Sequence, residues 1–434
     1  MIDITTAGIG FALMLVLMAF GLHIGTVMFA LGILGAGLFF GAPGVNALGV
    51  VYFEQMNADL LMALPLFILL GEILVRCGSS ERMYHSLSDW LNPLPGGLLH
   101  TNIAASALFS AISGSSVATA ATISTVALPT FRKKSYDVRV VLGSIAAGGS
   151  LGNLIPPGIA IIIYGVLTNT SVARLYAAAT IPGAVLTVMF MACIVIMALW
   201  NPAIAPREPV TDPLSVRLWR LVDLLPPLLV FAIVMGSIYA GWATATEAAA
   251  ISVIVALPIA AFYRKLSIAM LHDAYLSTIN LTALSMLILA GAFVLNFVLG
   301  MLGVTAVLGK FVATLDVTST QLLYILFVFY VILGTFFETL PMLVGTLPLV
   351  FPLIVAANID PVLFGVFLVL MCEISLISPP VGMTLYVIQA VRNEGSISDV
   401  FRGTVPFFVT MLLMTIVLIH WQDMALWLPR LAFD

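Results

Sequence analysis

The chain has 434 residues, of which 62% are hydrophobic and only 8% are charged, and its formal net charge is −4. Soluble domains carry roughly 25% charged residues because their surface must be solvated, so this composition excludes a soluble protein. Hydrophobic runs long enough to cross the ~30 Å hydrocarbon core of a bilayer recur throughout, and a length of ~20 residues per crossing gives about ten to twelve spans. We therefore predict an all-α polytopic membrane protein.

The distribution of Lys and Arg predicts the orientation of these spans. If residues 76–95 lie in the cytoplasm and the chain crosses at each span, all basic residues fall inside except Arg174, Lys310 and Arg430. Cytoplasmic loops of membrane proteins carry an excess of Lys and Arg, so this asymmetry supports the topology. Both termini are then predicted to lie outside. The topology requires two segments that enter and leave the membrane on the same face.

An internal repeat accounts for those two segments. An offset of 223 residues takes Ser115 onto Glu338, Pro129 onto Pro352, and the pair Pro156–Pro157 onto Pro379–Pro380. Residues 96–131 have basic loops on both sides, whereas residues 318–357 have weakly charged flanks. The first segment is therefore predicted to turn back from the inside and the second from the outside. Two re-entrant helical hairpins would face each other in an inverted repeat, with a binding site near the midplane.

The breaks in these segments suit ions and an anion. Proline removes a backbone donor and leaves the carbonyl one turn earlier without a partner. In hydrocarbon such a carbonyl is tolerated only where it is buried in protein or lines an aqueous cavity. Freed carbonyls with Ser, Thr or Asn oxygens suit a hard cation such as Na⁺, and helix N-termini favour a carboxylate. We predict one cation site per repeat with an anion between them; the alternative is that Gly and Pro only kink the spans.

Four glutamates lie in or beside apolar segments, where a carboxylate is costly and by default marks a functional position. Glu338 falls at the predicted tip of the second hairpin and is the strongest candidate for a functional acid. Glu247 follows Thr244 and is predicted to cap a helix N-terminus instead. The residues alone leave Glu72 and Glu373 undecided.

Four motifs carry a resemblance to a known family. They are Ile112–Ala121, Leu154–Gly158 with Ile163–Gly165, Thr244–Ala250, and Ile377–Gly382. In this order they resemble the large membrane subunit (the M or DctM-like subunit) of tripartite ATP-independent periplasmic (TRAP) transporters, in the ion transporter superfamily. The resemblance implies a periplasmic substrate-binding protein (the P subunit) that delivers an organic acid. It also implies a small membrane subunit (the Q subunit), coupling to two or more Na⁺ ions without ATP, and a multi-pass location in the bacterial inner membrane with both termini periplasmic.

The same resemblance implies an elevator-type transport domain that moves against a scaffold. The expected scaffold comprises residues 1–60 and 182–270, and the expected transport repeats comprise residues 61–181 and 271–402. A C-terminal span is expected at 403–434. The basic amphipathic stretch Arg207–Asp223 is predicted to lie along the cytoplasmic interface, with a solvated loop as the alternative.

The resemblance also assigns candidate site residues by motif position. The first Na⁺ site is expected to use Ser113, Ser115, Ser116, Gly152 and Asn153, and the second to use Thr335, Thr339, Ser375 and Ser378. The substrate is expected near Ser116, Asn153, Pro157, Thr339 and Pro380. Many members of the family carry Asp at the second tip, where this chain has Glu338. The acid is retained, but its longer side chain leaves its direct role open.

Other functions are less well supported by the sequence. A carboxylate–cation symporter that needs no receptor rests on the same physical features and stays open. A membrane-embedded enzyme would need a nucleophile–base pair or metal ligands such as a His-Glu-x-x-His helix, and none is present. The paired broken repeats favour alternating access over a channel. No feature indicates nucleic-acid binding.

Overall fold

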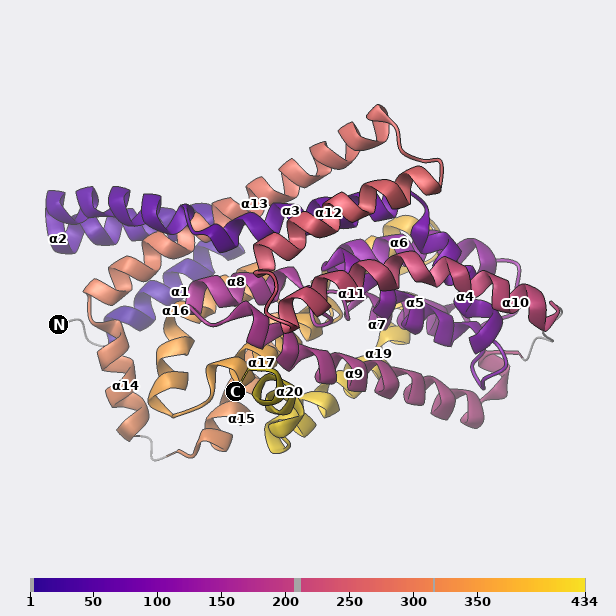
Figure 1. Ribbon diagram of the computed structural model, residues 1–434. Coiled ribbons are helices and arrows are strands. Elements are labelled where there is room, and N and C mark those ends of the chain that lie inside the picture. Colours follow the sequence, from indigo (N-terminus) through magenta and orange to yellow (C-terminus); the bar gives the residue numbers. More distant parts are fainter. Residues whose placement is uncertain (1–3, 207–211, 315–316, 434) are drawn as a thin grey trace.

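The computed structural model describes residues 4–206, 212–314 and 317–433, and this part of the chain is helical throughout, as predicted (Figure 1). Its helices are α1 (Ile4–Ala19), α2 (Ile24–Met56), η1 (Asp59–Met62), α3 (Ala63–Arg76), α4 (Ser79–Leu91), α5 (Leu98–Ser113), α6 (Ser116–Phe131), α7 (Val138–Gly149), α8 (Ile159–Thr168), α9 (Val172–Trp200), η2 (Pro202–Ile204), α10 (Leu214–Arg220), η3 (Leu221–Leu224), α11 (Leu225–Tyr239), α12 (Ala245–Phe262), α13 (Ile268–Met301), α14 (Val304–Thr314), α15 (Ser319–Gly334), α16 (Thr339–Ala356), α17 (Pro361–Leu376), α18 (Met383–Arg392), α19 (Ile397–His420) and α20 (Asp423–Phe433).

The number of uninterrupted spans is smaller than the sequence predicted. Among the described residues, seven helices are long and apolar enough to cross a membrane, or eight if the bent pair formed by residues 59–76 and α4 counts as one. The difference arises because the proline breaks divide long apolar stretches into shorter helices. The pairs α7/α8 and α17/α18 are such divided stretches.

The predicted repeat is visible in the helices. The offset of 223 residues takes the first residue of α6, Ser116, onto the first residue of α16, Thr339, and that of α7, Val138, onto that of α17, Pro361. Both proline pairs, 156–157 and 379–380, contain a cis peptide bond. The helix pairs α5/α6 and α15/α16 occupy the two predicted hairpin segments and lie toward opposite ends of the molecule (Figure 1).

Helices α2 and α13 form a closely packed pair outside the hairpins. A Cβ atom on Gly25 of α2 would come within 2.8 Å of the Leu287 carbonyl oxygen of α13, so the two backbones approach as closely as small residues allow. Helix α2 turns sharply at Gly41, whose φ of 63° suits glycine, two residues before Pro43. Although the predicted boundaries place α13 in the second transport repeat, its packing joins it to α2.

The stretch predicted to lie at the cytoplasmic interface contains a short helix, α10. The first five residues of the predicted stretch, 207–211, lie outside the described residues. The Arg217 guanidinium lies over the Trp90 ring, 4.7 Å from its centre, and Arg220 pairs with Asp89 of α4 at 2.7 Å. The side chain of Trp219 is 75% exposed. Helix α10 is therefore fixed to α4 by its basic side chains and leaves an apolar face uncovered.

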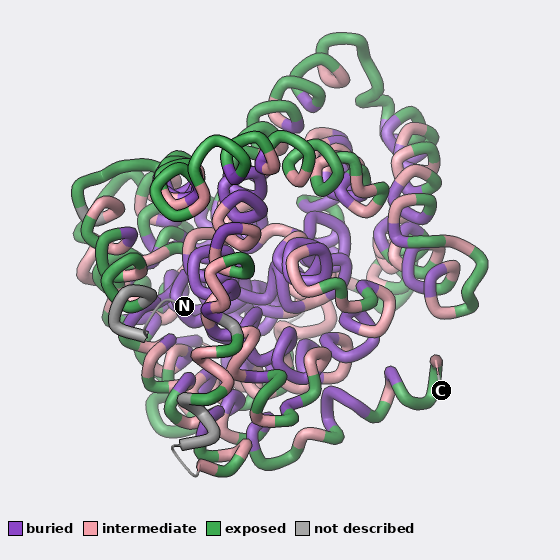
Figure 2. The backbone as a smooth tube through the Cα atoms, turned by 90° about the vertical axis from the view of Figure 1, so that its left-hand side faces the viewer, coloured by how far each residue is buried: buried purple, intermediate pink, exposed green. Residues whose placement is uncertain are grey.

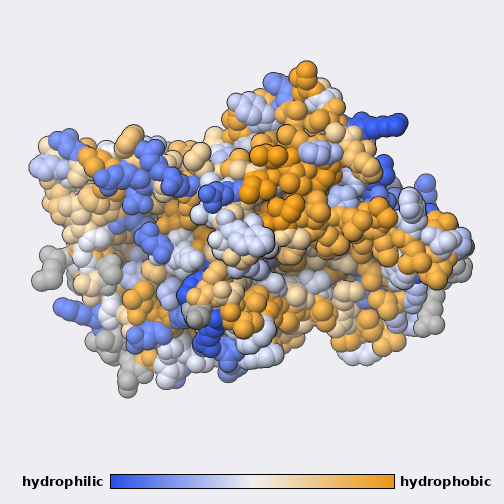
Figure 3. Space-filling model, in the orientation of Figure 1, coloured by the Kyte–Doolittle hydropathy of each residue, from blue (hydrophilic) through white to orange (hydrophobic). Residues whose placement is uncertain are grey.

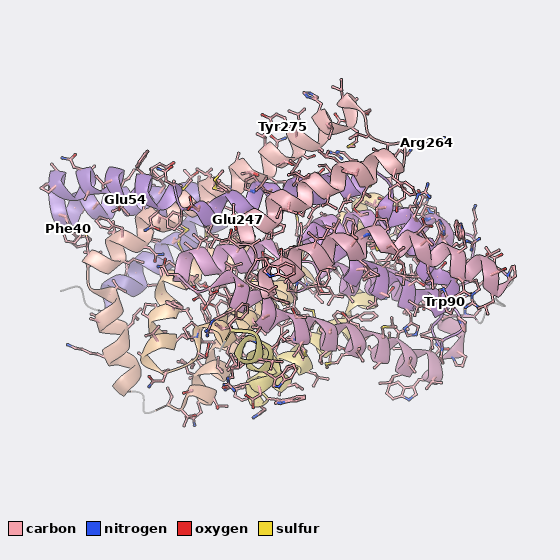
Figure 4. The ribbon with its side chains drawn as sticks, viewed as in Figure 1. Phe40, Glu54, Trp90, Glu247, Arg264 and Tyr275 are labelled. Atoms are coloured by element: carbon pink, nitrogen blue, oxygen red, sulfur yellow. The ribbon has the colours of Figure 1, made fainter. Side chains whose placement is uncertain are left out.

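The surface and core agree with a membrane protein. Figure 2 shows the buried backbone gathered in the middle of the helical assembly, with exposed segments around it. Figure 3 shows hydrophobic side chains over the region of α11, α12 and α13, where a soluble protein would carry charge. In Figure 4, Phe40 marks one end of the molecule and Trp90 the opposite end. The long axis of the assembly therefore runs from the Gly41 turn to the α4–α10 contact.

Candidate functional site

The first hairpin tip is held against the first proline break. Helix α5 ends at Gly114, which has a φ of 59°, and Ser115 then caps α6 by accepting a bond from the Ala118 amide. The Ile159 amide donates to the Gly114 carbonyl at 3.1 Å. A Cβ atom on Gly114 would overlap the carbonyl oxygen of Pro157. A glycine is therefore required here both for its conformation and for the close approach of the break.

All five residues of the predicted first cation site belong to this contact. Gly152 packs on the backbone of Ser115 and Ser116, so closely that a Cβ atom would lie 2.5 Å from the Ser115 carbonyl carbon. The Asn153 amide donates to the Ser116 hydroxyl at 3.1 Å. The Ser113 hydroxyl lies 3.5 Å from the Ser115 amide. The structure therefore brings the first predicted set together.

Three residues of the predicted second set, Thr339, Ser375 and Ser378, meet at one end of α17. The Thr339 hydroxyl donates to the Cys372 carbonyl of α17 at 3.4 Å, and the Ser375 hydroxyl donates to the same carbonyl at 2.6 Å. The Ser378 hydroxyl lies 3.5 Å from the Pro379 carbonyl, inside the second break. Thr335, in contrast, donates its hydroxyl to Ile332 of its own helix at 2.7 Å. Thr339, Ser375 and Ser378 thus lie along one end of α17. Thr335 directly follows Gly334, where an added Cβ atom would lie 2.9 Å from the Ser375 Cβ atom.

Glu338 lies at the second tip, as predicted, but it is exposed. It occupies the N-cap position of α16, and its side chain makes no capping hydrogen bond. The second break is also open, because Pro379 and Pro380 are exposed whereas Pro156 and Pro157 are buried. The Pro380 carbonyl accepts a bond from the Tyr386 hydroxyl at 2.7 Å. The second half of the candidate site therefore lies at the surface of the protein, and the first half is enclosed.

Glu373 completes the enclosed half, although the sequence left its role undecided. Its side chain is 0% exposed. One carboxylate oxygen accepts from the Ser116 hydroxyl at 2.6 Å, and the other accepts from the Asn153 side-chain amide at 2.8 Å. Asn153 also donates to the Ser116 hydroxyl at 3.0 Å. In the sequence, the only indication that Glu373 belongs to the site was its position in an apolar run, two residues before Ser375.

The other two glutamates have structural partners. Glu247 and Thr244 form a capping box at the start of α12, in which the Thr244 amide donates to the Glu247 carboxylate at 2.8 Å. The predicted capping role is confirmed. Glu72 pairs with Arg76 one turn later, at 3.0 Å. The Arg76 guanidinium therefore compensates the charge of the Glu72 carboxylate.

The predicted substrate position lies between these elements. Ser116 and Asn153 are in direct contact, Pro157 supports the first tip, and Thr339 reaches α17 from the opposite side. Helices α6 and α16 begin at Ser116 and Thr339, so both direct their N-terminal ends toward this region. Hydroxyls, carbonyls and helix N-termini are suited to a small cation and a carboxylate.

A separate cavity of about 610 Å³ lies between the α2–α13 pair and the second hairpin. Its walls include Phe293 of α13 and Phe351 of α16, and three carboxamides also line it, those of Gln55, Asn169 and Asn296. The packing between the hairpin and the α2–α13 pair is therefore incomplete on this side.

Comparison with known proteins gives one consistent family. The model of the family described as "Tripartite ATP-independent periplasmic transporter, DctM component" matches residues 11–424. The C4-dicarboxylate TRAP transporter large permease protein DctM of Pseudomonas aeruginosa is 30% identical over 91% of this chain and 91% of its own length. The sialic acid TRAP transporter large permease protein SiaM of Vibrio cholerae is 30% identical over 90% and 91%, respectively. The ectoine/5-hydroxyectoine large permease protein UehC of Ruegeria pomeroyi is 30% identical over 88% and 89%.

Among solved structures, the YdaH transporter of Alcanivorax borkumensis is similar in fold. The two chains superpose with a TM-score of 0.64 over 92% of this chain and 96% of the other, at 14% sequence identity. At that identity the likeness concerns the arrangement of helices alone.

Proposed function

Because this chain belongs to the DctM-component family of tripartite ATP-independent periplasmic transporters, we propose that it imports an organic acid across the bacterial inner membrane by coupling to a Na⁺ gradient. A periplasmic binding protein would deliver the acid, and a small membrane subunit would accompany this large one. Relatives at about 30% identity are named for a C4-dicarboxylate, a sialic acid and ectoine. The substrate class we propose is therefore a small molecule that carries a carboxylate.

One observation carries the proposal. The first residues of α6 and α16, which are equivalent in the repeat, both bond to α17, Ser116 through Glu373 and Thr339 through the Cys372 carbonyl. Two helix N-termini and two groups of hydroxyl and carbonyl oxygens therefore converge on one helix. Oxygen ligands of this kind suit Na⁺, and the helix N-termini between them suit a carboxylate.

We further propose that transport follows an elevator motion. The moving part would contain both hairpins and both broken spans, that is α5–α8 and α15–α18. The closely packed α2–α13 pair, with α11 and α12, would stay fixed. The cavity of about 610 Å³ between this pair and α16 supports the idea, because a surface that slides cannot interlock fully along its length.

The test is reconstitution in liposomes with labelled acids. The chain is reconstituted with its small subunit and supplied with the cognate receptor, using a C4-dicarboxylate, a sialic acid and ectoine as trial substrates. Uptake should need an inward Na⁺ gradient and should be lost when K⁺ replaces Na⁺. Uptake by the chain alone, without receptor or small subunit, would instead establish a self-sufficient symporter. Uptake that is unaffected by removal of Na⁺ would overturn the proposed coupling.

A further inference from the structure

The carboxylate of Glu373 is enclosed without a basic partner. Its side chain is 0% exposed, and its two hydrogen-bond donors, Ser116 and Asn153, are neutral. No charged neighbour acts on it among the residues that the structure describes. A buried charge is costly unless an opposite charge accompanies it, and within a membrane such a group normally serves a function. The charge must therefore be compensated by a proton or by a cation that the protein does not itself supply.

The chemistry around Glu373 favours a monovalent ion. In the described parts of the chain, no group of three or more His, Cys, Asp or Glu side chains could hold a metal ion. The groups around the carboxylate are neutral: the Ser116 hydroxyl and the Asn153 side-chain amide donate to it, and the Asn153 backbone amide donates to the Ser116 oxygen. One carboxylate among neutral oxygens matches the single charge of an alkali cation, whereas Ca²⁺ sites are rich in carboxylates.

The two repeats differ at this position. The offset of 223 residues places Ser150 opposite Glu373, and Leu376 opposite Asn153. The Ser150 hydroxyl donates to Ala147 of its own helix at 2.8 Å. The first repeat therefore supplies the amide and the second repeat supplies the carboxylate, and both act on the first site. The second site has no equivalent carboxylate.

The residue next to Glu373 contacts the other tip. The Cys372 carbonyl accepts from the Thr339 hydroxyl at 3.4 Å, and the Cys372 thiol lies 3.6 Å from the Thr339 carbonyl. Two consecutive residues of one helix thus hold the first residues of α6 and α16. A helix is stiff over one step, so a displacement of either tip is passed to the other.

From these contacts we propose that Glu373 is the counter-charge of the first cation site, and that the Cys372–Glu373 step couples this site to the second one. The inference rests on the proposed Na⁺-coupled function and adds a residue and a cause of cooperativity to it. Glu373 acts as an anionic ligand or, through Ser116 and Asn153, as a positioning residue. In both roles its negative charge strengthens cation binding.

The variant that tests the charge is Glu373→Gln. Glutamine keeps the size of the side chain and can still accept from Asn153. Its amide can donate to the Ser116 oxygen if that oxygen gives up one of the two bonds that it accepts from Asn153. The matched control is Glu247→Gln, which makes the same chemical change at an exposed helix cap where glutamine also serves. Two measurements are made: the rise in melting temperature of the purified chain in Na⁺ relative to K⁺, and the Na⁺ dependence of uptake.

We expect Glu373→Gln to raise the half-saturating Na⁺ concentration about tenfold or more, within the range typical of coupled sites, and to lower the Hill coefficient toward one. Its melting temperature in K⁺ should match that of the wild type, while the additional rise in Na⁺ should be lost. Wild-type Na⁺ affinity and cooperativity in Glu373→Gln would overturn the inference and leave the proposed function intact. Wild-type uptake that is independent of Na⁺ would overturn both.

A second variant covers the case in which Glu373→Gln fails to fold. Glu373→Asp keeps the charge but withdraws the carboxylate by one methylene, so it should retain part of the Na⁺-specific rise in melting temperature. If Glu373→Asp folds and loses that rise completely, the charge is not the cause and the inference is wrong.

Discussion

Gly152→Ala is the sharpest test of the enclosed site. The added Cβ atom would lie 2.5 Å from the Ser115 carbonyl carbon and would overlap the backbone of Ser116. Carbon atoms in contact normally lie ~3.5–4.0 Å apart, so the tip and the break must separate by about 1 Å. These are backbone atoms, and no side-chain rotation can relieve the overlap.

The expected loss follows from that displacement. A misplacement of about 1 Å at a reacting or binding centre can cost about 100-fold in rate, and overpacking of a core costs roughly 1–3 kcal/mol in stability. The initial rate of Na⁺-driven uptake should therefore fall by about 100-fold, while the chain still folds. The assay is uptake into proteoliposomes at the half-saturating Na⁺ concentration of the wild type.

Gly236→Ala is the matched control. A Cβ atom at Gly236 in α11 has no atom within 4 Å, so the same substitution meets open space. Alanine in a helix gains up to about 1 kcal/mol over glycine, and uptake should be unchanged. If Gly152→Ala transports as well as Gly236→Ala, Gly152 does not hold the tip in its working position and the site has been misassigned.

Four further outcomes are expected. Asn153→Ala should weaken the Na⁺ dependence of uptake more than it reduces the amount of protein in the membrane, because it removes a donor to the Ser116 hydroxyl; an unchanged Na⁺ titration would exclude Asn153 from the first site. Glu338→Gln should reduce uptake, but less than Glu373→Gln does, because Glu338 lies at the protein surface and Glu373 is enclosed; full activity would remove Glu338 from the mechanism. Thr244→Ala should lower the free energy of unfolding by about 1 kcal/mol and leave Na⁺ affinity unaltered, and a melting curve with a Na⁺ titration separates the two effects. Cysteines introduced at Trp242 and Lys265, at the two ends of α12, should react with impermeant reagents from the periplasmic and the cytoplasmic side respectively, and labelling from one side only would refute the proposed topology.

Local chemistry explains why much of the fold could be predicted. Two consecutive prolines remove two backbone donors, so the pairs 156–157 and 379–380 marked breaks without knowledge of any neighbour, whereas single prolines such as Pro258 lie inside helices. Glu247 could be assigned because a capping box lies within four consecutive residues. The equivalence of Ser116 and Thr339 followed from the spacing alone, and both residues begin helices at the hairpin tips.

Contacts between distant segments explain what the sequence could not provide. Glu373 and Ser116 are 257 residues apart, and only the packing of α17 against the first tip brings them together. The pairing of α2 with α13 is of the same kind, since neither helix contains a signal that names its partner. Expected boundaries drawn along the sequence therefore separated two helices that pack together.

Glu338 and Glu373 differ in the position that the fold gives to each carboxylate. The sequence favoured Glu338 because it falls at the predicted tip of the second hairpin. The tip, however, is where the chain leaves one helix and enters the next, and Glu338 is consequently exposed as an N-cap residue. Glu373 lies inside a helix, where the fold can enclose it fully. An enclosed carboxylate interacts more strongly with a bound cation than an exposed one because less water screens the charge, so the residue that breaks the symmetry has the larger effect on ion binding.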